Sequence, residues 1–312
     1  MKKILTTLLL ISTLLLLFVS CDGNVNEKYL RSSRKPLCFT ALTDETGVIL
    51  EKEGSPYAIN LQYSTDGRTW SDYYIEGELV YTANEGYVPL AKAGDKVYFK
   101  ATATNSDFNI NDSSYYHFVI FDQSNSNVSV NGDIMSLLDS ECMQTSIPTD
   151  YCFTHLFSNC IGLKDASDLI LSATKLTENC YYGMFVDCIS LTAAPVLNAT
   201  TLAKYCYAGM FQGCNTLETA PVLNATTLEE GCYNNMFYGC SMLNSVTCYA
   251  TDISAEGCTN EWLVNVSESG SMYVSKEANW SSGPSGIPEH WTKIPITHKA
   301  FQTGHAALFS LF

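Results

Sequence analysis

The sequence predicts a mixed α/β and β protein in two folded parts, a β-sandwich followed by a short solenoid of stacked repeats. Two observations predict this division. Residues 37–129 hold short runs rich in Val, Ile, Tyr and Phe that are broken by turn residues, and residues 130–294 hold columns of matching residues with a 26-residue period. The length of 312 residues agrees with about two domains at roughly 150 residues each.

The composition narrows the class of partner. Lys and Arg number 17 and Asp and Glu number 32, which gives a formal net charge of −15. Such a surface would repel the phosphates of a nucleic acid, so nucleic acid is excluded as a partner. The apolar content of 46% supplies enough side chains for a buried core and argues against a disordered chain.

The first 20 residues are typical of a bacterial export signal. Two lysines precede an apolar run over residues 4–19, which is shorter than the roughly 20 residues of a membrane span. The sequence Phe18-Val19-Ser20-Cys21 resembles the lipobox of bacterial lipoproteins, which implies that Cys21 is lipidated and becomes the mature N-terminus. An ordinary cleaved signal with an incidental cysteine is the alternative. Residues 21–36 are polar and are interpreted as a flexible tether.

The expected sandwich over residues 37–129 is antiparallel and immunoglobulin-like. The clearest strands are residues 48–50, 59–63 and 96–101, and the last two alternate apolar and polar side chains as strands with one buried face do. Asp66-Gly67 follows the second of these strands, where glycine permits the positive φ of a hairpin turn.

The repeat over residues 130–294 consists of cysteine, aromatic and leucine columns, closed by a C-terminal cap. Residues 194–202 recur unchanged as residues 220–228. A period in this range with leucine columns is typical of leucine-rich-repeat solenoids, in which each unit buries its apolar face against its neighbours. The columns contain Cys180, Cys206, Cys232 and Cys258; Cys188, Cys214 and Cys240; Met184, Met210 and Met236, each followed by Phe; and Leu163, Leu191, Leu217 and Leu243.

Each repeat is expected to combine a helical segment with a short extended one. Leu202, Cys206 and Met210 have the i, i+4, i+8 spacing of an apolar helical stripe, and Thr200 or Thr201 could cap its start. Residues 191–197 are expected to stack on residues 217–223 as a parallel sheet. Because a proline lies in each of these segments, the strands should be short or irregular.

The repeat C-Y-x-x-M-F-x-x-C-x-x-L-x-x-A-P-V-L-x-A-T-T-L resembles that of the BspA-like leucine-rich-repeat surface proteins of host-associated anaerobic bacteria. The resemblance covers roughly residues 37–294. It implies an exported, lipid-anchored protein of the cell surface or outer membrane, with binding or adhesion as its role. Residues 295–312 lie beyond the usual ending and form a tail to which no role is assigned.

The cysteines suggest three different chemistries. Zinc sites use closely spaced, converging ligands, whereas these pairs have C-x7-C spacing and align along the repeat, so no metal site is expected. Disulfides between equivalent cysteines would need side chains that approach each other, but equivalent side chains point in parallel directions. We therefore expect buried thiols that behave as small apolar residues, with a stray disulfide among Cys38, Cys142 and Cys248 left open.

The function predicted from the sequence is non-catalytic binding. The five histidines show no metal-ligand spacing, Cys152 near His155 belongs to the apolar column, and no phosphate loop or nucleophile elbow is present, so neither enzyme activity nor a cofactor is expected. The partners expected are the membrane, through the lipid, and a host or bacterial surface protein; a surface glycan-binding module and a structural coat protein are the alternatives.

The predicted partner-binding face is a strip that alternation along the extended segments would turn outward. An exposed apolar strip of this kind often marks an interaction site. The alternative is that these leucines turn inward or pack on the sandwich. The strip contains Leu171, Pro195, Leu197, Pro221, Leu223 and Tyr249.

Overall fold

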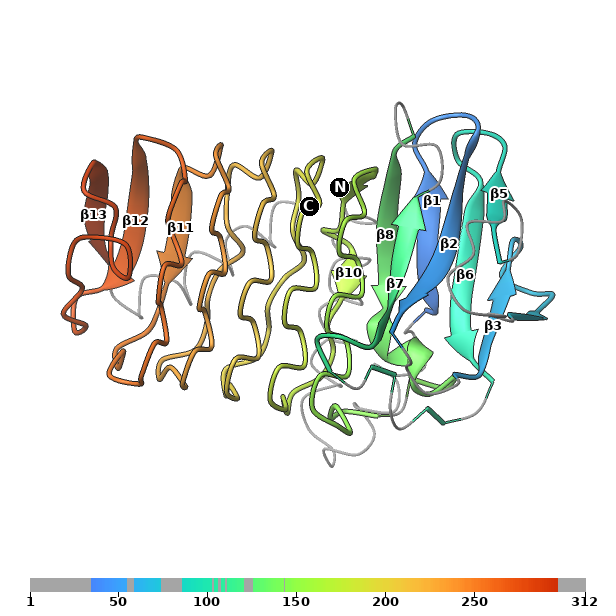
Figure 1. Ribbon diagram of the computed structural model, residues 1–312, viewed down its shortest axis with the longest axis horizontal. Helices are drawn as coiled ribbons and strands as arrows, with labels where there is room; N and C mark the ends of the chain where they lie inside the picture. The colour runs from blue at the N-terminus through green and yellow to red at the C-terminus, as the bar shows by residue number, and fades with distance from the viewer. Residues whose placement is uncertain are drawn as a thin grey trace, which may run out of the picture.

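Two packed sheets at one end of the molecule continue into a long stack of chain turns, which ends in a small third sheet (Figure 1). The computed structural model describes residues 35–54, 59–73, 86–102, 104–105, 108–109, 111–120, 126–142 and 144–296. The predicted export signal, the lipid site Cys21, residues 21–34 of the tether and residues 297–312 of the tail lie outside the described residues.

The N-terminal part contains two sheets whose strands are mostly antiparallel. The larger sheet has the strand order β10-β8-β1-β6-β3-β4 with β9 paired to β8, and the smaller has the order β5-β2-β7. The expected strands at 48–50, 59–63 and 96–101 lie in or overlap β2, β3 and β6, and β3 pairs with β4 through the turn at Asp66-Gly67. The strands are β1 (Leu37–Ala41), β2 (Thr46–Glu53), β3 (Leu61–Ser64), β4 (Ser71–Tyr73), β5 (Val88–Leu90), β6 (Lys96–Ala101), β7 (Tyr115–Ile120), β8 (Val128–Asp133), β9 (Leu163–Asp165) and β10 (Leu169–Ile170).

An aromatic core joins the two sheets. The Phe39 ring lies 6.1 Å from the Phe99 ring and 4.9 Å from the Phe118 ring, between centroids, and all three side chains are fully buried. Because β1 and β6 belong to the larger sheet and β7 to the smaller, these contacts bury the inner faces of both. Burying large aromatic side chains is the main source of stability for such a sandwich.

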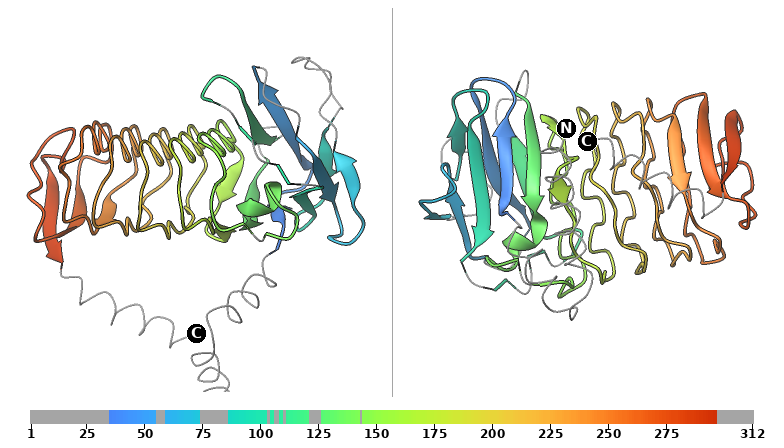
Figure 2. Two further views of the ribbon diagram at one scale, coloured as in Figure 1. Left: turned by 90° about the horizontal axis from the view of Figure 1, so that it is seen from below. Right: turned by 180° about the vertical axis from the view of Figure 1, so that it is seen from behind.

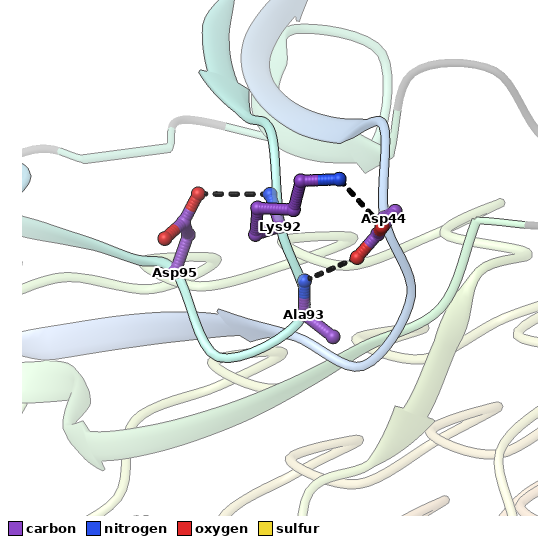
Figure 3. Close-up of polar contacts among 4 residues, drawn as sticks. All are labelled: Asp44, Lys92, Ala93 and Asp95. Carbon is purple, nitrogen blue, oxygen red and sulfur yellow. Dashed lines mark hydrogen bonds and ion pairs between the residues drawn. The ribbon is translucent and has the colours of Figure 1, made fainter.

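A polar network closes the turns at one end of the sandwich (Figure 3). The Asp44 carboxylate, in the turn after β1, accepts hydrogen bonds from the Lys92 ammonium at 2.8 Å and the Ala93 N–H at 2.9 Å. The Asp95 carboxylate accepts from the Lys92 N–H at 2.9 Å. The Lys92 contact lowers the pKa of Asp44. These exposed contacts fix the register of two neighbouring turns and contribute little stability in water.

The strand β8 belongs to both parts of the molecule. It pairs antiparallel with β1 and parallel with β9 and β10, so the predicted boundary between residues 129 and 130 falls inside one strand. After β8 the Asp133 carboxylate accepts from the Met135 N–H at 3.0 Å and caps the 3₁₀ helix η1 (Ile134–Leu137). A single continuous cluster of buried side chains therefore extends from the sandwich into the stack.

The stack consists of five rungs, which we name by their first residues: Cys152, Cys180, Cys206, Cys232 and Cys258. One side of each rung is a run of tight turns in which every second N–H stays within the rung. Met184 N–H donates to the carbonyl of Tyr181, three residues before it, at 3.3 Å, and the pattern repeats along the rung. The intervening N–H groups reach the next rung: Tyr181 donates to Cys206 at 3.0 Å, and Phe185 to Met210 at 2.8 Å. Figure 2 shows the rungs side by side between the sandwich and the terminal sheet.

Each turn requires a residue with positive φ at every fourth position of the turn side. Glycine and asparagine adopt this left-handed region more readily than other residues, and they occupy most of these positions. On the turn side of the five rungs, the residues with positive φ are Tyr151, His155 and Asn159; Asn179, Gly183 and Asp187; Tyr205, Gly209 and Gly213; Gly231, Asn235 and Gly239; and Gly257, Glu261 and Asn265.

The predicted mixed α/β leucine-rich solenoid is wrong. The described residues are almost entirely β and turn, they form several separate sheets without a closed solenoid, and η1 is their only helix. The i, i+4, i+8 spacing of Leu202, Cys206 and Met210 reflects the four-residue period of the turns. None of the described residues forms a helix long and apolar enough to cross a membrane.

The extended side of the rungs forms parallel contacts only in part. Between the middle rungs these are single bridges, such as Thr219 with Ser245 and Leu223 with Cys248. A regular parallel sheet appears at the end, where β11 (Ser245–Cys248), β12 (Gly270–Ser275) and β13 (Trp291–Ile296) pair in that order.

The left-handed positions give a matched pair of glycine substitutions. At Gly231 (φ 58°) an added Cβ would overlap the Tyr205 ring of the preceding rung, whereas at Gly257 (φ 59°) nothing lies within 4 Å. We expect Gly257→Ala to lower the free energy of unfolding by about 1–2 kcal/mol, the cost of a left-handed alanine. Gly231→Ala should lower it by about 2–5 kcal/mol, because overpacking adds to that cost. Urea unfolding followed by circular dichroism measures both, and equal losses would contradict the role of the Tyr205 contact.

Candidate functional site

The strip predicted from the sequence lies in the core. Leu171, Leu197, Leu223 and Tyr249 are 3%, 2%, 1% and 5% exposed. Pro195 is also buried, and Pro221 is half-buried. The expectation that this strip faces solvent is therefore wrong, and its leucines turn inward, as the alternative interpretation stated.

An exposed apolar column lies one residue earlier in the same segments. Ile170 is 41% exposed and Val196 is 56% exposed, and Val222, one 26-residue step after Val196, is half-buried. In an extended chain successive side chains point to opposite sides, so an error of one residue exchanges the buried and the exposed sets. We call Ile170, Val196 and Val222 the apolar column.

The sequence contains a pattern that predicts which side chains of this segment face solvent. From Val196 to Thr200 exposed and buried residues alternate strictly: Val196, Asn198 and Thr200 are exposed, whereas Leu197 and Ala199 are buried. Asn and Thr are the residues that prefer solvent. Had they fixed the direction, Leu197 would have been assigned to the core and Val196 to the surface.

The cysteine columns lie inside the stack. All twelve cysteines of the described residues are buried, and the same residues contain no group of three or more potential ligands that could hold a metal ion. Burial raises the pKa of both Cys240 and Cys248 to about 12, which keeps these groups as thiols. Thiols in this state are poor nucleophiles and poor metal ligands.

One cysteine column also bonds the rungs to each other. The Cys188, Cys214 and Cys240 thiols donate to the Phe157, Phe185 and Phe211 carbonyls of the preceding rungs at 3.0, 3.2 and 3.0 Å. Each contact places a weak donor against a carbonyl in the interior, where these three cysteines are fully buried. Alanine and valine have no side-chain donor and could not make this contact.

The pair Cys152 and His155 does not form a catalytic arrangement. Cys152 is fully buried, while His155 packs against the Tyr115 ring at 4.7 Å and the Tyr182 ring at 5.3 Å between centroids. Burial lowers the pKa of His155. Cys152 therefore belongs to the core, and His155 belongs to a cluster of aromatic side chains at the surface.

A hollow of about 290 Å³ lies at the far edge of the sandwich, lined mainly by the β3–β4 hairpin and β5. Its Asp66 carboxylate accepts hydrogen bonds from the N–H groups of Thr69 and Arg68, both at 2.7 Å, and from the Ser64 hydroxyl at 2.9 Å. These bonds lower the pKa of Asp66. Because the carboxylate is used to close the turn, the hollow presents no free charged group of its own.

The chain was compared with protein-family models, with curated proteins and with solved structures. No match was found in any of the three comparisons. The comparisons therefore assign no family. The resemblance of the repeat to BspA-like surface proteins stays a prediction, and the functional argument depends on the surface of this chain alone.

The burial of the thiols predicts their reactivity. In the native protein the twelve described cysteines should react with iodoacetamide at pH 8 far more slowly than an exposed thiol, because they are inaccessible and protonated. In guanidinium chloride, without reductant, all twelve should be labelled, as measured by the mass increase of the intact chain. Fast labelling in the native state would contradict the burial, and failure to label after unfolding would indicate disulfides.

Proposed function

We propose that the chain is a non-catalytic binding or adhesion protein that is held at the bacterial cell surface by a lipid and contacts a protein partner through the apolar column. The observation that carries the proposal is the solvent exposure of Ile170 and Val196 at matching positions of successive rungs. Water-exposed β-branched side chains in a row are unfavourable unless a partner covers them.

The surroundings of the apolar column also favour a protein partner. The exposed side chains of the segment that contains Val196 include short polar ones, namely Thr192, Asn198 and Thr200. An apolar centre with a polar rim is the usual anatomy of a protein interface. The glycan alternative is less well supported at this surface, because sugar rings stack on aromatic side chains and the column has none.

Substitution of the apolar column tests the binding surface. Val196→Glu with Val222→Glu should weaken binding about fivefold or more, because a charge replaces an apolar centre contact. Thr200→Glu with Thr226→Glu adds the same charge at exposed positions of the same rungs and should have less effect. The full chain in neutral detergent would be measured against immobilised extracellular-matrix and bacterial surface proteins, beside a glycan array.

The outcomes of this measurement separate the three classes of function. Protein binding that only the valine pair weakens would support the proposal. Binding that both pairs leave unchanged would contradict it, and binding to glycans alone would favour the glycan module. Absence of any binding would favour a structural coat. Leu197→Glu with Leu223→Glu is unsuitable as a test, because both leucines are buried and the variant should unfold.

The lipid anchor is tested separately. The export signal and the lipobox-like sequence support lipidation of Cys21, and two or more acyl chains would make membrane attachment stable. Cys21→Ala, expressed in a bacterium that processes lipoproteins, should move the protein from the membrane fraction to the soluble fraction, whereas Asn24→Ala should leave fractionation unchanged. Retention of Cys21→Ala in the membrane fraction would contradict the anchor.

A further inference from the structure

A cluster of half-buried aromatic side chains lies where the first two rungs meet β7. The His155 ring contacts Tyr115 with an interplanar angle of 38° and Tyr182 with an angle of 87°, so the rings face in different directions and do not form one flat platform. Tyr151 lies in the same region, because its N–H donates to the Glu178 carbonyl, four residues before Tyr182, at 2.9 Å, and Tyr182 is among the groups that act electrostatically on its ring. We call Tyr115, Tyr151, His155 and Tyr182 the aromatic cluster.

Two of these rings occupy left-handed turn positions, most of which are glycine or asparagine in the other rungs. Tyr151 and His155 have φ of 59° and 56°, in the left-handed region that costs a non-glycine residue free energy. At the position of His155 the next two rungs have Gly183 and Gly209. Gly183 also leaves room for the His155 ring, since a Cβ there would lie 2.5 Å from its Cε1 atom. The chain therefore keeps large rings at this place in spite of the backbone conformation.

Three carboxylates lie beside the aromatic cluster. Asp150 directly precedes Tyr151, and its carboxylate accepts a hydrogen bond from the Glu178 N–H at 3.0 Å. Asp112 lies in the turn that leads into β7, three residues before Tyr115. In agreement with this placement, burial raises the pKa of Tyr151 and the charges of the three carboxylates raise it further. All three are exposed. The ion pairs formed by the described part of the chain are Lys92 with Asp44, Lys204 with Glu230 and His117 with Glu51, so none of them neutralises these carboxylates.

Ring faces and carboxylates attract the same kind of ligand group. The face of an aromatic ring carries negative potential and attracts a cation, most often an arginine guanidinium. Nearby carboxylates add to this attraction. A neutral sugar would gain from a flat ring face but not from the charge of the carboxylates, and the differing ring directions offer it no extended platform.

We propose that the aromatic cluster, together with Asp112, Asp150 and Glu178, binds a basic side chain of a protein partner. The proposal rests on the proposed function only in taking a protein as the partner. It uses none of the residues of the apolar column. It adds the chemistry of the partner: a segment with exposed arginine or lysine, which suits a chain with a net charge of −15.

A capped tetra-arginine peptide with a fluorescent label is the probe, and its affinity for the full chain in neutral detergent is measured by anisotropy at fixed ionic strength. Asp112→Asn with Glu178→Gln should weaken binding about three- to tenfold, and Tyr182→Leu about two- to fivefold. The matched control, Asp168→Asn with Glu218→Gln, makes the same change of charge at exposed acids away from the cluster and should change the affinity less than about twofold. Circular dichroism checks that each variant is folded.

Three results would overturn the proposal. Equal weakening by the two charge variants would show attraction to the overall negative charge alone. An unchanged affinity in Tyr182→Leu would remove the rings from the site. Binding of a neutral glycan that Tyr182→Leu abolishes, without binding of the peptide, would make the cluster a sugar site. In each case an effect of Val196→Glu with Val222→Glu on protein binding would still stand, so the two proposals fail separately.

Discussion

Backbone N–H groups are divided between bonds within a rung and bonds to the neighbouring rung, and this division determines how the chain stacks. In an α-helix every interior N–H bonds within its own segment, so nothing on the backbone is left to bind a neighbouring segment. In the turns of this protein alternate N–H groups bond within the rung, and the others, such as those of Tyr181 and Phe185, bond to the next rung. Buried backbone groups must be paired, so once one rung adopts the turns its neighbour must follow them.

The buried columns are a consequence of this arrangement. Rungs that are hydrogen-bonded at equivalent positions place equivalent side chains on top of each other, so the Phe185 ring stacks on the Phe211 ring at 5.4 Å and 3°. The thiol of Cys214 fits the narrow space beside the Phe185 carbonyl of the preceding rung. The sandwich supports the first rung in a similar way, because the Phe118 N–H of β7 donates to the Leu156 carbonyl at 2.8 Å.

The same stacking places equivalent surface positions of adjacent rungs next to each other. Val196, which is exposed, and Val222, which is half-buried, occupy such positions because residues 194–202 recur as residues 220–228. The places where repetition fails are equally informative. His155 stands where the next two rungs have glycine, and it lies at the contact with β7, where the aromatic cluster gathers. We therefore expect a partner to contact both the apolar column, which is repeated, and the aromatic cluster, which is present once at the contact with β7.

The 26-residue period, the membership of the columns and the main strands of the sandwich were predictable from the order of the amino acids. The matched cysteines and the alternation around residues 59–63 and 96–101 are local signals, because residues that must be buried together recur with the geometry of the chain. The packing of the rungs was needed to show that the repeated stripe is a run of turns and which side of residues 195–197 is buried. A spacing of four residues suits a helix and a four-residue turn equally well, and pairing with the neighbouring rung selects the turn. The glycine or asparagine at most of the left-handed positions and the alternation from Val196 to Thr200 carried the relevant information, but the direction of each side chain became definite only when stacked rungs buried one side.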